Sequence, residues 1–327
     1  MMKSAGANEV YERMQESSSA IKYAVGAMQP IDPNYTANTY GEGDRVKNQL
    51  DKNLKPAGIV CDFEYQGSVT NHTHIKAKSD IDLLTLHCRF VGIEPPQPNT
   101  SPYQGNPVAD LLQLRRSSVS ILEAKFPEAT VDASGSKSVC IEGGSLRRKI
   151  DVVVSNWWDT NDYARTRQKK DRGVEILDAH ELKRISNLPF LHNDRIETKD
   201  AMTLGGMRKA ARLLKSLKYD AAQEVSLSSY DIAALAYTMD NQKLIVMKGQ
   251  ELQLVMNCKE HLDHVAGNSL YRSSLEVPNG TRKIFCAGGA TVAKLDELRR
   301  ELDGLVYDIT NDLSRSFRKL ASARVDY

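Results

Sequence analysis

The sequence predicts an α+β protein in which a mixed half of strands and helices is followed by a helical half. In residues 59–66, apolar side chains alternate with polar ones at the two-residue period of a half-buried strand. From about residue 180 onward, apolar residues recur at the helical period instead. The turn Asn187-Leu188-Pro189 lies near this change, so we expect one domain at 1–180 and a second at 181–327.

The first half is expected to begin with a helix over 7–28 and a second from about 44 to 54, each ended by prolines. Between 94 and 107, five prolines and one glycine predict a loop. Pro107 suits the first position of a helix that runs to residue 125. Strand patterns occupy 59–66, 80–86, 138–141, 149–155 and 173–177.

The second half is expected to hold long helices. Ser228 is followed three residues later by Asp231, a capping pattern that places a helix start at this point. The helical periods cover 198–218, 228–240, 249–264 and 291–318.

Charge and composition exclude several classes of protein. The 327 residues carry 44 Lys and Arg against 42 Asp and Glu, a net charge of +2 that does not suit non-specific coating of nucleic acid. No apolar run approaches the roughly 18 residues of a membrane span, and the first residues lack an apolar signal. The five cysteines are widely spaced without a C-x-x-C, which favours reduced thiols over disulfides or structural zinc. We therefore expect a cytoplasmic protein without a membrane partner.

The most informative residues are three aspartates. Asp80 and Asp82 are separated by one residue in a strand pattern, so their carboxylates lie on one face, where they repel unless a cation lies between them. Asp151 interrupts an apolar strand that has little reason to hold an isolated carboxylate. If the two strands are neighbours, the three carboxylates form a site for two hard divalent cations. A D-x-D pair alone is more often a strand-end turn.

Gly67-Ser68 follows the first strand and precedes Asp80 by twelve residues. The order strand, Gly-Ser, D-x-D strand and distant Asp strand resembles the polymerase-β-like nucleotidyltransferase superfamily. The resemblance implies a catalytic core with a mixed twisted sheet in residues 1–180. It also implies that Gly67 and Ser68 hold the triphosphate, and that Asp151 helps to deprotonate the acceptor hydroxyl. The implied ligands of two Mg²⁺ or Mn²⁺ ions are Asp80, Asp82 and Asp151.

A second group of candidates lies in the helical half. Residues 207–218 hold five basic residues and no acid, and Arg208, Arg212 and Lys215 share one helix face. That spacing alone favours a solvated amphipathic helix. Ser229 and Tyr230 stand at the next helix start, where they are either cap and packing residues or a phosphate site with a base-stacking ring.

Two further basic runs have open interpretations. Arg147, Arg148 and Lys149 lead into the Asp151 strand, where a contact to phosphate and an exposed strand edge are equally supported. The run from Arg165 to Arg172 is interrupted by Asp171, and a solvated loop is favoured over a ligand site.

A lysine-bearing helix followed by Ser-Tyr is similar to the cyclic GMP-AMP synthase and oligoadenylate synthetase branch of the superfamily. The resemblance implies that Lys215 and Ser229 contact the triphosphate and that Tyr230 stacks on the base, with Lys218 as a second candidate for the lysine. It further implies that 181–327 is an oligoadenylate synthetase-like helical lobe, with the active site in the cleft between the lobes. Clustered Cys and His ligands are missing, so zinc-thumb DNA sensing is not implied. The closer resemblance is to the bacterial cyclic GMP-AMP synthase-like nucleotidyltransferases (CD-NTases).

The resemblance implies a metal-dependent nucleotidyltransferase that joins ATP, GTP or other NTPs into a cyclic di- or trinucleotide and releases pyrophosphate. Its expected setting is bacterial anti-phage (CBASS) signalling, with a downstream effector protein and operon-encoded regulatory proteins as partners. Two alternatives remain open. One is a template-independent enzyme or toxin that adds nucleotides to RNA or tRNA, and the other is a catalytically silent nucleotide-binding regulator.

Overall fold

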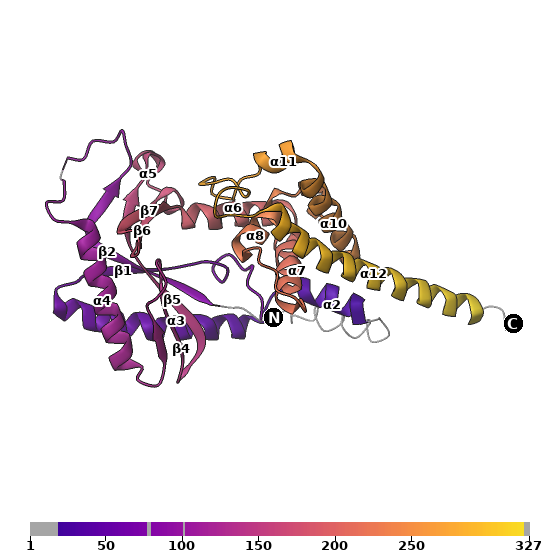
Figure 1. The fold of residues 1–327 in the computed structure, drawn as a ribbon, viewed down its shortest axis with the longest axis horizontal. Helices are drawn as coiled ribbons and strands as arrows, with labels where there is room; N and C mark the ends of the chain where they lie inside the picture. Colours follow the sequence, from indigo (N-terminus) through magenta and orange to yellow (C-terminus); the bar gives the residue numbers. More distant parts are fainter. Residues whose placement is uncertain (1–18, 77–79, 101, 324–327) are drawn as a thin grey trace, which may run out of the picture. The chain divides into compact units, whose positions relative to one another are not determined.

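The computed structural model describes residues 19–76, 80–100 and 102–323 (Figure 1). The chain forms two compact units. The sheet unit comprises Ile31–Thr198 and Pro278–Thr281, and the helical unit comprises the described part of Met1–Pro30, Lys199–Val277 and the chain from Arg282 on. Among the described helices, none combines the length and the apolar character that crossing a membrane requires.

The sheet unit is built on one seven-stranded sheet of the described residues. The strand order is β1-β2-β5-β4-β3, with β6 pairing with β5 and β7 pairing with β6. β2 and β5 are parallel, and the other pairs are antiparallel. The strands are β1 (Cys61–Gln66), β2 (Ile81–Ile93), β3 (Thr130–Asp132), β4 (Val139–Gly143), β5 (Leu146–Asp159), β6 (Gly173–Asp178) and β7 (Lys183–Asn187).

Alternate residues of the central strands belong to two different apolar cores. Ile81 and Leu83 of β2 pack with residues of α3 and α4 in one core. Leu84 of β2 and Val153 of β5 belong to a second core on the other side of the sheet. Since side chains alternate along a strand, Asp82 and Asp151 lie on the face opposite α3 and α4. The helical elements of this unit are α3 (Pro33–Leu54), η1 (Lys55–Ala57), α4 (Pro107–Lys125), α5 (Asn161–Thr166) and η2 (Lys169–Asp171).

The helical unit consists of helices packed around α7. Arg212 of α7 is buried, donates from Nε to the carbonyl oxygen of Met28 at 2.9 Å, and has its pKa lowered by burial to about 10. Arg208 pairs with Asp200 at 3.1 Å. The prediction that Arg208 and Arg212 lie on a solvated face of this helix is therefore wrong. The helices are α2 (Ser19–Met28), α7 (Gly206–Asp220), α8 (Ser229–Thr238), α9 (Asn241–Leu244), α10 (Glu251–Gly267), α11 (Ser269–Ser274) and α12 (Val292–Ala323).

Several expected boundaries are confirmed. α4 begins with Pro107 and ends at Lys125, and the Asn106 side chain caps it by accepting from the Ala109 amide. The capping pattern at Ser228 is also confirmed, because its Oγ accepts from the Asp231 amide at 3.0 Å.

Other boundaries differ for identifiable reasons. Pro33 begins α3 instead of marking a break, because Asp32 caps the helix through the Asn34 amide at 2.8 Å. The helix expected over 198–218 is two helices, α6 (Pro189–Met202) and α7, separated by a turn in which Gly205 has φ +86°. β3, β7 and α5 were not expected. Part of the helix expected over 7–28 lies outside the described residues.

The compact units also divide the chain differently from the expected boundary at 180/181. α2 belongs to the helical unit, and the chain passes from one unit to the other within α6. That residues 1–180 and 181–327 form two separate domains stays a prediction.

Candidate active site

Asp82 and Asp151 are direct neighbours in the sheet. β2 and β5 pair in parallel with Asp82 opposite Asp151, so their Cα atoms lie about 4.8 Å apart, the usual spacing of paired strands. Asp80 stands just before β2 and two residues from Asp82. The two-cation site depended on the condition that the strands of Asp82 and Asp151 are neighbours, and this condition is met.

The aspartates occupy the middle of a lateral row. Gln66 of β1 pairs with Asp82, and Cys140 of β4 pairs with Asp151. At the far side of the row, Asp132 of β3 pairs with Cys140. Burial raises the pKa of Cys140 to about 11, so the thiol stays protonated at neutral pH and adds no charge. Asp82 and Asp151 therefore project from two hydrogen-bonded central strands, and this pairing fixes the spacing between them.

Lys149 is the cation closest to these carboxylates among the contacts of the described residues. Its Nζ lies 3.2 Å from Asp151 Oδ2 and 3.9 Å from Asp80 Oδ2. Burial lowers the pKa of Lys149, but Asp151, together with Cys140 and Asp80, outweighs burial and leaves the pKa raised. Because Lys149 precedes Asp151 by two residues in β5, the strand period could have placed it on this face.

The donor atoms suit a hard divalent cation, since they are carboxylate oxygens on adjacent strands. In the described part of the chain, however, no three Asp, Glu, His or Cys side chains are grouped to hold an ion. The geometry is that of a carboxylate set paired with an ammonium. The carboxylates of Asp80 and Asp151 are both ion-paired with Lys149.

The Gly67-Ser68 turn packs directly on Asp82. Gly67 has φ +84°, and a Cβ built there would overlap Asp82 Oδ2. The turn is closed by two hydrogen bonds: the Thr73 amide donates to the Ser68 carbonyl oxygen at 3.0 Å, and Thr70 Oγ1 donates to the Gly67 carbonyl oxygen at 2.8 Å. The structure therefore places Gly67 against Asp82 and gives the glycine a steric role there, with Ser68 as the next residue of the turn.

Replacing Gly67 with alanine should separate catalysis from stability. We expect a loss of about 1–2 kcal/mol from the positive φ, and a fall in activity of at least about 100-fold because Asp82 must move. The matched control is Gly58→Ala, where φ is +75° but nothing lies within 4 Å of the added Cβ. Urea unfolding should give similar losses for both variants, with activity lost only in Gly67→Ala. Equal activities in the two variants would contradict this role.

A second group of candidates assembles where α8 begins. Ser229 Oγ lies 2.9 Å from the hydroxyl of Tyr219, and Lys218 Nζ donates to the Leu227 carbonyl oxygen at 2.6 Å. Tyr230 is 38% exposed. Lys215 is only 4% exposed within α7, so its expected contact with triphosphate stays a prediction. Lys218, the second candidate, donates its hydrogen bond to Leu227, the residue that precedes the Ser228 cap of α8.

Sequence reasoning missed the residue that supports Tyr230. The Arg282 guanidinium lies 5.3 Å from the Tyr230 ring centroid and donates to Asp231 Oδ1 at 2.6 Å. The other carboxylate oxygen of Asp231 accepts from Ser228 Oγ at 2.7 Å. No local pattern links Arg282 to this helix start, because the contact joins residues about fifty positions apart.

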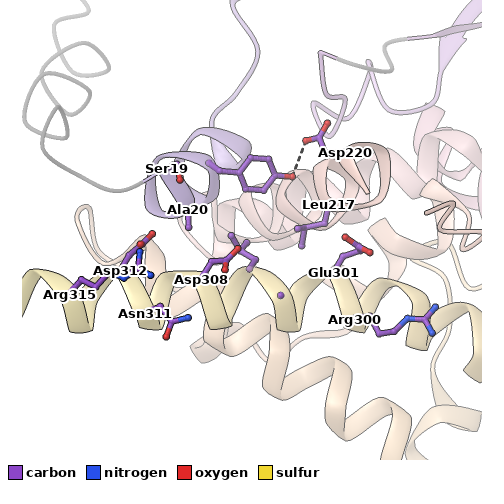
Figure 2. Close-up of a pocket in the computed structure, with 13 residues that line it drawn as sticks. Ser19, Ala20, Leu217, Asp220, Arg300, Glu301, Asp308, Asn311, Asp312 and Arg315 are labelled. Carbon is purple, nitrogen blue, oxygen red and sulfur yellow. Dashed lines mark hydrogen bonds between the residues drawn. The ribbon is translucent and has the colours of Figure 1, made fainter. Parts of the chain in front are cut away.

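A cavity of about 630 Å³ also lies within the helical unit, among α2, α7 and α12 (Figure 2). At one end, the Tyr23 hydroxyl donates to Asp220 at 2.9 Å. Carboxylates outnumber cations in the lining, and such a surface repels a triphosphate. None of the nucleotide-binding candidates lines it. The charged lining residues are Asp220, Glu301, Asp308, Asp312, Arg300 and Arg315.

The basic run from Arg165 to Arg172 is engaged in ion pairs. Lys169 pairs with Glu64 at 2.5 Å and Arg172 with Asp159 at 2.7 Å. Lys170 pairs with Asp194 at 3.5 Å. These pairs disfavour a free phosphate-binding stripe, and the run lies at the end of α5 and in η2 instead of in the expected loop.

Comparisons with known proteins point to one activity. No protein-family model matches the chain. A cyclic dinucleotide synthase, CdnE, of Yersinia aleksiciae is 40% identical over 282 residues, which is 85% of this chain and 74% of the relative. A c-di-GMP synthase of a Lachnospiraceae bacterium is 30% identical, covering 70% of this chain and 73% of that protein. The solved structure of a STING-associated CdnE c-di-GMP synthase from Flavobacteriaceae sp. superposes with a TM-score of 0.75 at 26% identity, covering 90% and 88% of the two chains.

Proposed function

The chain belongs to the bacterial cyclic GMP-AMP synthase-like nucleotidyltransferases (CD-NTases), and from that premise we propose that its three aspartates and the turn at Gly67 catalyse formation of a cyclic dinucleotide. The protein is a nucleotidyltransferase that makes cyclic oligonucleotides, and its expected polymerase-β-like fold is confirmed. The observation that carries the proposal is the register of β2 and β5, which sets Asp82 beside Asp151.

Each candidate has a role that its surroundings support. Asp80, Asp82 and Asp151 supply oxygen ligands, a role supported by the pairing of Asp82 with Asp151, and Asp151 also accepts the proton of the attacking ribose hydroxyl. The turn at Gly67 and Ser68 holds the triphosphate beside Asp82.

The nucleotide base and the far phosphates are assigned to the helical unit. Tyr230 stacks on the base, and its ring is supported on Arg282. Ser229 contacts phosphate at the start of α8, with Lys215 or Lys218 as the cation.

The family is generally metal-dependent, and the implied cofactor is two Mg²⁺ or Mn²⁺ ions. When bound, such ions polarise the attacking hydroxyl and neutralise charge on the departing pyrophosphate. The protein's contribution is to fix the carboxylates on paired strands and to bring the hydroxyl of one nucleotide in line with the α-phosphate of the next.

The names of the relatives favour a dinucleotide product, with GTP as the first substrate to test. The Yersinia relative is named a cyclic dinucleotide synthase, and other relatives are named c-di-GMP synthases. The STING association of the Flavobacteriaceae protein favours a STING-type effector for this product as well. We place the enzyme in cytoplasmic anti-phage signalling, with operon-encoded regulators as further partners.

The product assay tests the proposal. The protein is incubated with labelled ATP, GTP, CTP and UTP, singly and together, with Mg²⁺ or Mn²⁺, and then treated with phosphatase. We expect a phosphatase-resistant product with the mass of a cyclic dinucleotide, formed from GTP alone. A linear product, a product that depends on added RNA, or no product with either metal would contradict the proposal.

A further inference from the structure

The structure pairs Lys149 with the carboxylate site. Its ammonium lies 3.2 Å from Asp151 Oδ2 and 3.9 Å from Asp80 Oδ2, so it offsets part of the negative charge that the aspartates bring together. A cation that binds the same oxygens therefore competes with this ammonium.

Lys149 has the geometry of an exchangeable group. Its side chain is 32% exposed, and it reaches the site from the same strand as Asp151. A lysine side chain is a long flexible stem with a compact charge, so its ammonium can leave the carboxylates without a backbone shift. The sequence left open whether this lysine contacts phosphate or stands at an exposed edge, and the structure instead places it against the aspartates.

We propose that Lys149 is an internal counterion of the active site: it pairs with Asp80 and Asp151 before the catalytic cations arrive, and it must be displaced for them to bind. The inference rests on the proposed function, because it takes these aspartates as the metal ligands. Lys149 thereby stabilises the carboxylate set and competes with the metal ions for it. It is a positioning residue and not a group that reacts.

The test measures Mn²⁺ affinity in the nucleotide-free, full-length protein by electron paramagnetic resonance of free Mn²⁺. Lys149→Met should bind Mn²⁺ about fivefold more tightly than the wild type, the effect expected from losing a partly exposed ion pair that competes with the metal. Lys149→Arg keeps the competing charge and should stay within about twofold of the wild type. In thermal unfolding, Lys149→Met should melt lower than the wild type without metal and equally with saturating Mn²⁺.

The control is Lys55→Met, which removes an equal charge from an ion pair with Asp51 elsewhere in the sheet unit. Its Mn²⁺ affinity should match the wild type. Unchanged or weaker Mn²⁺ binding in Lys149→Met, or equal tightening in Lys149→Arg or Lys55→Met, would overturn the inference. These outcomes are separate from a failure of the proposed function, which appears as missing cyclic product and is measured with nucleotides.

Discussion

Replacing Asp151 with asparagine should lower the rate of cyclic product formation by at least about 10³-fold, because it removes the carboxylate that we propose as metal ligand and proton acceptor. Stability should change little. Asp151 forms a partly exposed ion pair with Lys149, and the loss of such a pair costs less than about 1 kcal/mol. Initial rates with saturating GTP and Mn²⁺, together with urea unfolding curves, measure both quantities.

The same lateral row of the sheet provides the control. Asp132 lies two strands away from Asp151, and its carboxylate accepts from the Ser134 amide at 2.8 Å. Asp132→Asn should keep wild-type activity within about twofold, since it is outside the carboxylate site. If both variants lose activity equally, general disruption of this sheet face would explain the result better than loss of a metal ligand.

Replacing Arg282 with methionine should destabilise the protein by about 3 kcal/mol, because it leaves the Asp231 charge buried without its partner. The Asp231 side chain is only 3% exposed, whereas Arg282 is 33% exposed, which keeps the cost near the lower end of the range for buried pairs. Loss of the guanidinium beside Tyr230 should also raise KM for the nucleotide more than it lowers kcat.

The neighbouring Lys283 is a matched control. It forms an ion pair of similar length with Glu276, at 2.9 Å, but both partners are about half exposed. Lys283→Met should therefore cost less than about 0.5 kcal/mol and leave KM unchanged. Similar losses of stability in Arg282→Met and Lys283→Met, measured by urea unfolding, would show that burial of Asp231 does not determine the effect.

Local signals predicted the parts of the site that depend on neighbouring residues. The strand period put Asp80 and Asp82 on one face, and the apolar run around Asp151 indicated a buried strand; that this strand pairs with the Asp82 strand came from the structure. The Ser228 cap and the Pro107 helix start are likewise local, because each depends on residues within one turn.

Features that depend on distant residues were not predictable in this way. The period on α7 suggested a solvated basic face, but the packing of Arg212 on the Met28 carbonyl oxygen comes from a helix almost two hundred residues away. The partnership of Arg282 with Asp231 is non-local for the same reason. The two-residue spacing between Lys149 and Asp151 could be read from the sequence. Only the side-chain conformation shows that the Lys149 ammonium contacts the carboxylates of Asp80 and Asp151 instead of extending into solvent at the strand edge.

The central claim is that Asp80, Asp82 and Asp151 hold the catalytic metal ions beside the turn at Gly67. Anomalous scattering from Mn²⁺ in crystals grown with a non-hydrolysable GTP analogue tests it most directly. We expect two peaks about 3.5–4 Å apart, each bound by these carboxylates and by triphosphate oxygens, with Lys149 turned away from Asp151. Mn²⁺ bound elsewhere with the triphosphate, for example at the carboxylates around Glu301 in the helical unit, while Lys149 remains paired with Asp151, would contradict the account.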